Sequence, residues 1–400
     1  MWLFIITYLM YGIGKLEGSM SLIDVNPEVL MNISEIICYR GYPSEEYIIQ
    51  TDDGYYLTIN RIPHGIENPG NSGPKPIILL QSGLVLEGSN WVANFPNHSL
   101  GFILANAGYD VWIGNTRGST GAKKHDKYSD DQEEFSSYSF HEMAVYDLPA
   151  IINFILQTTG QKELYYVGFS QGTTLGFIAF SSMPELAQKI KMFFALAPIT
   201  ILQYGNTPTI RLLLLPHVLI KAIVGNKYFF NRPKIVNKII TQMCSCKIFH
   251  WLCSLVFSIS GGFNSSLNKN RLDIYMSHFP DSTSVQNILH WGQTYQTGEF
   301  KNYDYGSENK AKYNQTDAPF YRLEDMKVPT ALWYAGNDWI VDLKDAERLI
   351  PQINNIVYKK YIPHWTHFDF IWGLEAPEQL YNEIVGLLRR NPLQNCIELL

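Results

Sequence analysis

The chain has no long run of charge of one sign. Its 400 residues include 31 Lys or Arg and 37 Asp or Glu, which gives a formal net charge of −6 at pH 7. Nucleic-acid-binding proteins carry clustered basic residues, so the lack of a basic run argues against such a partner. Blocks of like charge are typical of disordered tails, and their absence argues against a tail of this kind.

Cysteine is also scarce. Five are present, too few for a disulfide-framework protein: Cys38, Cys244, Cys246, Cys253 and Cys396. In an oxidising compartment Cys244 and Cys253 could close one short loop, although Cys246 competes for the same role. The Cys-x-Cys pair has no second Cys or His pair at metal spacing, so it does not indicate zinc. Since no cofactor fingerprint is visible either, we expect neither a metal nor a cofactor.

The apolar run that opens the chain, MWLFIITYLMYGIG over residues 1–14, is too short for a membrane-spanning helix. Its length suits the hydrophobic region of a signal peptide, which we expect over residues 1–18 with cleavage after Gly14 or Gly18. The alternative is an N-terminal core or anchoring helix. We expect no transmembrane anchor once a signal peptide has been removed.

Sequons for N-glycosylation support passage through the secretory pathway. There are four Asn-x-Ser/Thr sites, at Asn32, Asn97, Asn264 and Asn314. We therefore expect a secreted glycoprotein, with the lysosome as the alternative destination.

The apolar residues that are present can build a large core, since they make up 46% of the chain and aromatic residues 14%. A hairpin is predicted over residues 47–62, turning at Asp53-Gly54. The other predicted strands cover residues 76–83, 108–118, 164–170, 190–198, 328–338 and 355–362, and the predicted helices cover 142–160, 171–183, 343–351 and 376–389. Alternation of strands and helices favours a mostly parallel sheet with helices on both faces.

The alternation is interrupted between residues 200 and 325. This stretch has long apolar helical runs, such as TIRLLLLPHVLIKAIVG and KIFHWLCSLVFSISGGF. We therefore predict one α/β core, formed by residues 19–199 and 326–400, with a mostly helical insertion over 200–325. The apolar side chains of the insertion are expected both to form core and to cover a greasy substrate site.

The stretch ELYYVGFSQGTT contains the motif Gly168-Phe-Ser-Gln-Gly172. A β-favouring run precedes the motif and helix-forming sequence follows it, which is the strand–turn–helix setting of a nucleophile elbow. At so sharp a turn, side chains two residues before and two after the serine would collide, and Gly168 and Gly172 remove them. We therefore predict that Ser170 is a nucleophile at a helix N-terminus, which favours negative charge. The alternative is a Gly/Ser turn without chemistry.

A serine nucleophile needs a base, and the base needs an orienting acid. In this architecture they follow in the order Ser, acid, His, each at the end of a later strand. Asp338 follows a predicted strand and is the predicted acid, with Asp342 and Asp345 as fallbacks. His367 is the predicted base in preference to His364, because it lies deeper in the loop after the next strand.

Backbone N–H groups are expected to hold the oxyanion. One is that of Gln171, the residue after the nucleophile, and the other is that of Leu84, in the loop after an early strand. Gly83 lets the backbone of this loop approach closely.

At these residues the chain resembles the acid lipase family, which includes gastric and lysosomal acid lipases. The resemblance covers nearly the whole chain after the leader, with matches such as YDLPAIINFILQTTGQ, YYVGFSQGTTLGFIAFS, RLDIYMSHFPDSTSVQNILHW and PHWTHFDFIWG. It implies an α/β-hydrolase core with a helical cap and lid, and hydrolysis of triacylglycerols or cholesteryl esters. By motif position it implies Ser170 as nucleophile, Asp338 as acid, His367 as base, Leu84 and Gln171 as oxyanion donors, and a cap disulfide between Cys244 and Cys253.

The chain departs from the family pattern at three places near the motifs. Phe169 stands where the family usually has His, and Ser82-Gly83 stands where it usually has His-Gly. In the loop after Arg117-Gly118, the family usually has Trp in the region that Gly121 occupies. No triad group is lost, so we expect activity with an altered pH dependence or a looser oxyanion loop.

The function expected from these features is lipid ester hydrolysis at a lipid–water interface through an acyl-enzyme. Two alternatives are a soluble carboxylesterase acting on small esters and a catalytically silent lipid-binding relative. The complete triad argues against the silent protein.

Overall fold

The computed structural model describes residues 26–66, 73–230, 232–263 and 266–393. The predicted signal peptide, the sequon at Asn264 and Cys396 lie outside these residues.

Within the described residues, nine strands form one sheet in the order β1-β2-β4-β3-β6-β7-β10-β11, with β5 paired to β2. The pairs β1–β2, β2–β4 and β2–β5 are antiparallel, and all pairs from β4 to β11 are parallel. The strands are β1 Glu45–Gln50, β2 Tyr55–Ile62, β3 Ile77–Gln81, β4 Asp110–Gly114, β5 Lys124–His125, β6 Leu164–Phe169, β7 Ile190–Leu196, β10 Thr330–Ala335 and β11 Ile356–Ile362. Each predicted strand is present, and β5, only two residues long, was not predicted.

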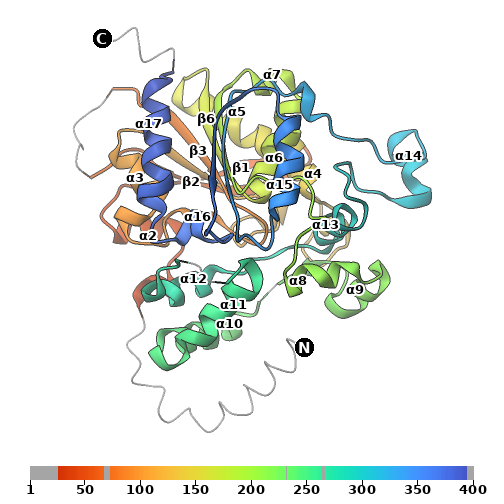
Figure 1. Ribbon diagram of the computed structural model, residues 1–400, viewed down its shortest axis with the longest axis horizontal. Helices are drawn as coiled ribbons and strands as arrows, with labels where there is room; N and C mark the ends of the chain where they lie inside the picture. Colours follow the sequence, from red (N-terminus) through yellow and green to blue (C-terminus); the bar gives the residue numbers. More distant parts are fainter. Residues whose placement is uncertain (1–25, 67–72, 231, 264–265, 394–400) are drawn as a thin grey trace.

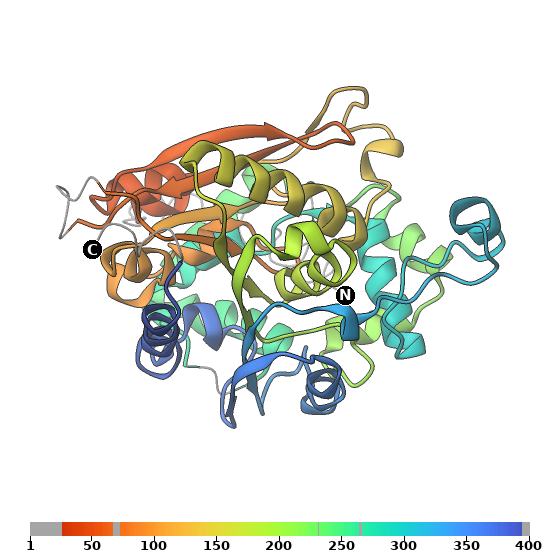
Figure 2. The ribbon, with the colours of Figure 1, turned by 90° about the horizontal axis from the view of Figure 1, so that it is seen from above.

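Helices cover both faces of the sheet, as predicted: α3 and α17 lie on one face, and α5, α6 and α15 lie on the other (Figures 1 and 2). Because β3, β4 and β6 are buried on both faces, their residues are mostly apolar rather than alternating between apolar and polar. The helices of this part are α2 Ile33–Tyr39, α3 Leu100–Asn106, α4 Phe140–Glu142, the π-helix η6 Met143–Asp147, α5 Leu148–Thr159, α6 Gln171–Ser182, α7 Pro184–Ala187, α15 Leu343–Leu349, α16 Asp369–Trp372, the π-helix η13 Pro377–Tyr381 and α17 Asn382–Arg390.

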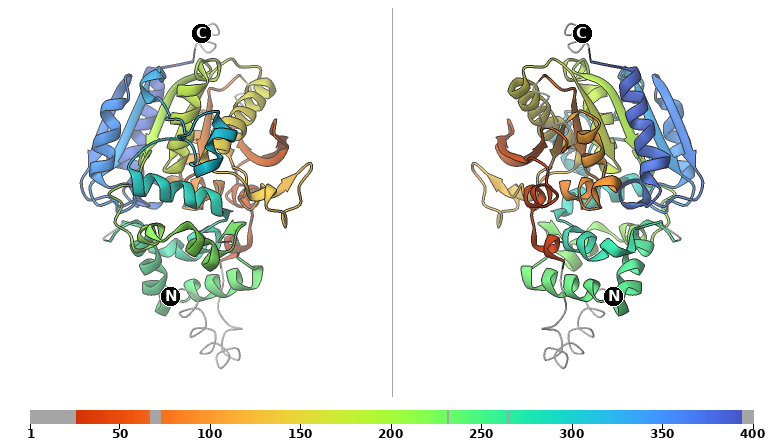
Figure 3. Two further views of the ribbon diagram at one scale, coloured as in Figure 1. Left: turned by 90° about the vertical axis from the view of Figure 1, so that its right-hand side faces the viewer. Right: turned by 90° about the vertical axis from the view of Figure 1, so that its left-hand side faces the viewer.

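Between β7 and β10 the chain leaves the sheet and forms a mostly helical segment. Most of it lies in one layer beneath the sheet in Figure 1, and Figure 3 shows the same layer from the sides. Its elements are α8 Pro208–Arg211, η7 Leu212–Leu214, α9 His217–Val224, β8 Tyr228–Phe229, α10 Lys234–Ser245, α11 His250–Gly261, α12 Leu272–His278, β9 Thr283–Ser284, α13 Val285–Thr297 and α14 Asn309–Tyr313.

The first apolar run of this segment is broken rather than one continuous helix. Leu215 has an extended backbone, with φ −67° and ψ 146°, and α9 begins only after Pro216. The ring of a proline disfavours helical backbone in the residue before it, so the run divides here.

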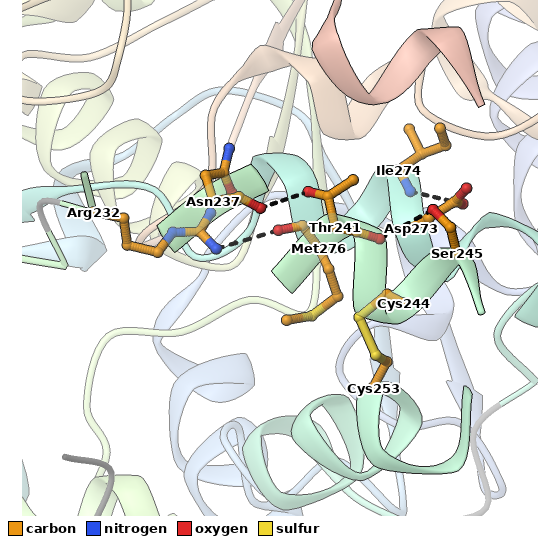
Figure 4. The surroundings of a disulfide bond; sticks show 9 residues. All are labelled: Arg232, Asn237, Thr241, Cys244, Ser245, Cys253, Asp273, Ile274 and Met276. Atoms are coloured by element: carbon orange, nitrogen blue, oxygen red, sulfur yellow. Dashed lines mark hydrogen bonds between the residues drawn. A yellow bond between two sulfur atoms is a disulfide. The ribbon is translucent and has the colours of Figure 1, made fainter. Parts of the chain in front are cut away.

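A disulfide joins Cys244 of α10 to Cys253 of α11 (Figure 4), which is the predicted pairing, and Cys246 keeps a free thiol. The α10 helix is also held to α12, because the side-chain amide of Asn237 donates to the carbonyl of Ser277 at 2.9 Å. The two helices linked by the disulfide are therefore fixed to the rest of the inserted segment.

Among the described helices, none alone has the length and apolar composition to cross a membrane. One bent pair, 236–245 with 247–261, meets both criteria when taken together, with an angle of 97° at the break.

Candidate active site

Ser170 lies at a sharp turn between strand β6 and helix α6. Its backbone has φ 53° and ψ −123°, a conformation that residues with side chains rarely adopt. A Cβ atom on Gly168 would lie 2.6 Å from the carbonyl oxygen of Gly172, and one on Gly172 would lie 2.4 Å from the carbonyl oxygen of Gln81. Both positions therefore require glycine. A side chain at 168 would clash with Gly172, and a side chain at 172 would clash with the end of β3.

The serine, the histidine and the aspartate that the motifs singled out are joined in series by two hydrogen bonds. His367 Nε2 is 2.9 Å from the Ser170 hydroxyl, and His367 Nδ1 is 2.7 Å from Asp338 Oδ2. The three residues are 2–6% exposed. This chain of contacts matches the arrangement in which an imidazole takes a proton from a hydroxyl while a carboxylate orients it.

Asp338 is held by the turn in which it lies. Its Oδ1 accepts the backbone N–H groups of Ile340 and Val341, both at 2.9 Å, which leaves Oδ2 for the imidazole. The turn therefore fixes the direction of the carboxylate.

The fallback residues have other partners. Asp342 caps helix α15 by accepting from the N–H of Lys344, and Asp345 accepts from the N–H of Tyr204. His364 is exposed, and its Nε2 lies 2.9 Å from Oε2 of Glu375.

The inserted segment contacts the acid and base loops directly. The carbonyl of Gly261, the last residue of α11, accepts the N–H groups of His367 at 3.1 Å and Trp339 at 3.3 Å. A Cβ atom on Gly261 would lie 2.7 Å from the ring of Phe368. Sequence reasoning missed this contact, and its signal was the Gly-Gly pair that ends the apolar run.

The loop after β3 lies against the nucleophile. A Cβ atom on Gly83 would be 2.9 Å from the Cβ of Ser170, so Gly83 allows the close approach that we predicted. Leu84 follows it in this loop, and Gln171 is the first residue of helix α6. The Ser82 hydroxyl donates to Asn90 Oδ1 at 2.6 Å and is buried.

The residues that depart from the family pattern lie at different distances from this site. Phe169 is fully buried, and its ring centroid is 4.9 Å from that of His367. Gly121 instead lies against β2, where its carbonyl accepts the Thr58 hydroxyl at 2.7 Å. Phe169 therefore forms an apolar wall beside the imidazole, and Gly121 does not contribute to that wall.

A cluster of acidic side chains lies beyond the loop after β3. The N–H of Asp281 donates to the carbonyl of Val85 at 2.8 Å, and its carboxylate accepts from the N–H and hydroxyl of Thr120. Burial, together with the nearby Glu87, raises the pKa of Asp281 to about 6. Glu87 lies 2.6 Å from His278 Nδ1. No sequence motif marked this cluster.

No group of three or more His, Cys, Asp or Glu side chains is arranged to hold a metal ion in the part of the chain that the structure describes. A hydroxyl, an imidazole and a carboxylate in this order can supply the nucleophile, the base and the orienting acid that acyl transfer requires.

Two family profiles match the sequence. The profile described as alpha/beta hydrolase fold matches residues 76–374, and the one described as partial alpha/beta-hydrolase lipase region matches residues 33–95.

Two solved structures share the fold. A soluble variant of monoglyceride lipase from Saccharomyces cerevisiae has a TM-score of 0.53 and 13% identity, over 91% of this chain and 98% of that one. An epoxide hydrolase from Vigna radiata has a TM-score of 0.50 and 15% identity, over 87% of this chain and 98% of that one. Because these two enzymes differ in reaction, the likeness shows the fold alone.

Sequence relatives are much more similar. Lysosomal acid lipase/cholesteryl ester hydrolase of Homo sapiens is 51% identical over 378 residues, covering 94% of this chain and 95% of the relative. Lipase member M of Homo sapiens is 49% identical over 393 residues, covering 98% of this chain and 93% of the relative. The chain therefore belongs to the acid lipase family of α/β-hydrolases, and it is a carboxylic ester hydrolase.

Proposed function

We propose that this protein is a lipase that hydrolyses triacylglycerols or cholesteryl esters through a Ser170 acyl-enzyme. The observation that carries the proposal is the pair of hydrogen bonds that joins Ser170, His367 and Asp338 in series, at 2.9 and 2.7 Å.

In the first half of the proposed reaction, His367 Nε2 removes the proton of the Ser170 hydroxyl as the oxygen attacks the ester carbonyl. Asp338 keeps the imidazole in orientation and stabilises its charged form. The N–H groups of Leu84 and Gln171 stabilise the oxyanion of the tetrahedral intermediate. His367 then protonates the departing alcohol, which leaves the acyl-enzyme.

In the second half, His367 removes a proton from a water molecule that attacks the acyl carbonyl. The tetrahedral intermediate collapses, Ser170 regains its proton from the imidazolium, and the fatty acid is released.

The inserted segment, residues 200–325, is proposed to act as a cap that meets the lipid. Apolar side chains stand exposed on it: Leu212, Leu214, Val218, Leu219, Ile223, Ile248 and Trp251. Exposed apolar side chains can mark an interaction site, and contact with a lipid surface would bury them. Ser170 is only 6% exposed, so admission of an acyl chain requires part of the surrounding structure to move.

The substrate class is supported by the relatives. The 51% identical human relative carries cholesteryl ester hydrolase in its name, and the other carries lipase. We further propose that the protein is routed through the secretory pathway, with residues 1–18 as signal peptide. The sequon residues Asn32, Asn97 and Asn314 are exposed, which glycosylation requires.

A hydrolysis panel tests the proposal. Emulsified triacylglycerol, emulsified cholesteryl ester and a soluble short-chain ester are compared from acid to neutral pH, with Ser170→Ala as the blank. We expect a higher rate on at least one emulsion than on the soluble ester. Hydrolysis confined to the soluble ester would instead identify a carboxylesterase, and no hydrolysis would identify a silent relative.

A further inference from the structure

Gln171 follows the nucleophile, and its buried side chain extends from the elbow to helix α13. Its Oε1 accepts the indole N–H of Trp291 at 2.7 Å and the amide N–H of Asn287 at 3.0 Å. The two donors are four residues apart on α13, so they lie on one face of that helix. All three side chains are buried.

The orientation of both amide groups follows from their partners. An indole N–H only donates, so the oxygen of the Gln171 amide must face α13. The N–H of Phe140 donates to Asn287 Oδ1 at 2.8 Å, so the NH₂ group of Asn287 is the one that faces Gln171. Both contacts are therefore true donor–acceptor pairs.

Asn287 and Trp291 are themselves fixed in place. The NH₂ group of Asn287 also donates to the hydroxyl of Thr283 at 3.1 Å, and its backbone N–H donates to Ser284 at 2.9 Å. The ring centroid of Trp291 lies 4.8 Å from that of Phe140. The side chain of Gln171 is thus bound to a rigid part of the inserted segment.

We propose that Trp291 and Asn287 are positioning residues for the oxyanion hole. They hold the Gln171 side chain, and this fixes the direction of the Gln171 backbone N–H at the first turn of α6, where N–H groups have no partner within the helix. Stabilisation of an oxyanion depends on donors that are oriented in advance, so a rotation of this residue weakens it. The inference rests on the proposed function, in which that N–H contacts the reacting oxygen.

The proposal implies that α13 belongs to the catalytic scaffold. Any part of the inserted segment that moves to admit substrate must leave α13 in contact with the elbow.

Steady-state kinetics on a soluble short-chain ester test the proposal with three variants: Trp291→Phe, Gln171→Met and the double variant. Trp291→Phe keeps an aromatic ring and removes one donor, while Gln171→Met keeps the length and removes the acceptor. We expect each to lower kcat roughly 10-fold, as a small misplacement of a catalytic group does, with KM within about twofold of wild type. The double variant should lose no more than Gln171→Met, because Trp291 acts through Gln171.

Trp333→Phe is the matched control. The indole of Trp333 is also buried, but it donates to Glu383 of α17 at 2.9 Å and makes no hydrogen bond to Gln171, so kcat should stay at the wild-type value. A fluorophosphonate titration counts the reactive serines in each preparation, so a folding defect is separated from a loss of turnover.

Wild-type kcat per reactive serine in Trp291→Phe would overturn the proposal, as would losses that multiply in the double variant. If wild-type protein neither reacts with the probe nor hydrolyses the ester, the proposed function fails instead. If Trp291→Phe does not fold, Gln171→Met alone decides: an unchanged kcat contradicts the proposal, and a lowered kcat at unchanged KM supports it.

Discussion

At the scale of single residues, Phe169 determines what lies beside the imidazole of His367. Its ring is fully buried, 4.9 Å from the imidazole and 6.4 Å from the ring of Phe370. It offers no hydrogen bond to the oxyanion loop, and the Ser82 hydroxyl is directed to Asn90. The His367 imidazole therefore lies against an apolar wall, with Asp338 as its hydrogen-bond partner.

Phe169→His places a second imidazole next to the base. At acid pH the new side chain is protonated, and its positive charge repels a second positive charge on the neighbouring imidazole. Since the reaction needs neutral His367, the acid limb of kcat/KM should move toward lower pH by up to ~1 unit. Phe169→Leu, which adds no charge, should leave the limb in place. A pH profile of kcat/KM checks this, and an acid limb that moves to higher pH would contradict it.

At the scale of elements, the end of α11 connects the loops that carry the acid and the base. The carbonyl of Gly261 accepts from His367 and from Trp339, the residue after Asp338. The helix is in turn joined to α10 by the Cys244–Cys253 disulfide. The inserted segment therefore contacts both loops through the end of α11.

Gly261→Ala should disturb the base. The new Cβ atom would lie 2.7 Å from the Phe368 ring and 3.2 Å from the Cβ of His367, so the loop must shift. A displacement of this kind costs up to roughly 100-fold in kcat. Gly386→Ala is the control, because its Cβ would meet only the Arg390 side chain, at 3.6 Å, within helix α17. Steady-state kinetics of both variants measure the difference, and equal kcat values would contradict the argument.

Helix α9 presents apolar side chains to solvent, with Val218 81% and Ile223 59% exposed. Replacing both by Ser should lower hydrolysis of an emulsified ester several-fold, since a buried methylene contributes ~0.8 kcal/mol to binding a lipid surface. Hydrolysis of a soluble ester should be unchanged. Ile48→Ser is the control, because it removes a similarly exposed side chain, 70% exposed, from β1, outside the inserted segment. Equal losses on emulsified and soluble esters would contradict the role of α9 at the interface.

At the scale of the whole molecule, buried carboxyl groups make stability depend on pH. Burial raises the pKa of Asp345 from 3.8 to about 7. Such a group contributes stability that is present below pH ~4 and is lost as pH rises through about 7, because the folded protein must then hold a buried charge.

Asp345→Asn removes this cost. The amide oxygen can still accept the N–H of Tyr204, which Asp345 now accepts at 2.9 Å. Near pH 4 the free energy of unfolding of the variant should equal that of wild type. At pH 8 it should be higher by roughly 1–3 kcal/mol, and the difference should grow as the pH rises from 4 to 8. Denaturant unfolding at the two pH values measures it. A gain that is larger in acid would show that the sign is wrong.

Much of this architecture could be predicted from the sequence, because its signals are local. Buried parallel strands are continuous apolar runs, and the elbow glycines lie within five residues of each other. The contacts from the inserted segment could not be predicted, since Gln171 and Trp291 are 120 residues apart. Strand β5 was missed because two residues are too few to form a pattern, and the break at Pro216 shows that apolar composition does not ensure one helix.

The proposed reaction depends most on Ser170 as an activated nucleophile, and active-site labelling measures this property most directly. Wild-type protein is treated with a fluorophosphonate probe, and the labelled peptide is mapped. We predict one label per chain, on Ser170, with loss of ester hydrolysis in proportion, and no label on Ser170→Ala or on wild type unfolded in denaturant. Hydrolysis that continues with Ser170 fully labelled, or a label on another residue that abolishes it, would contradict the account.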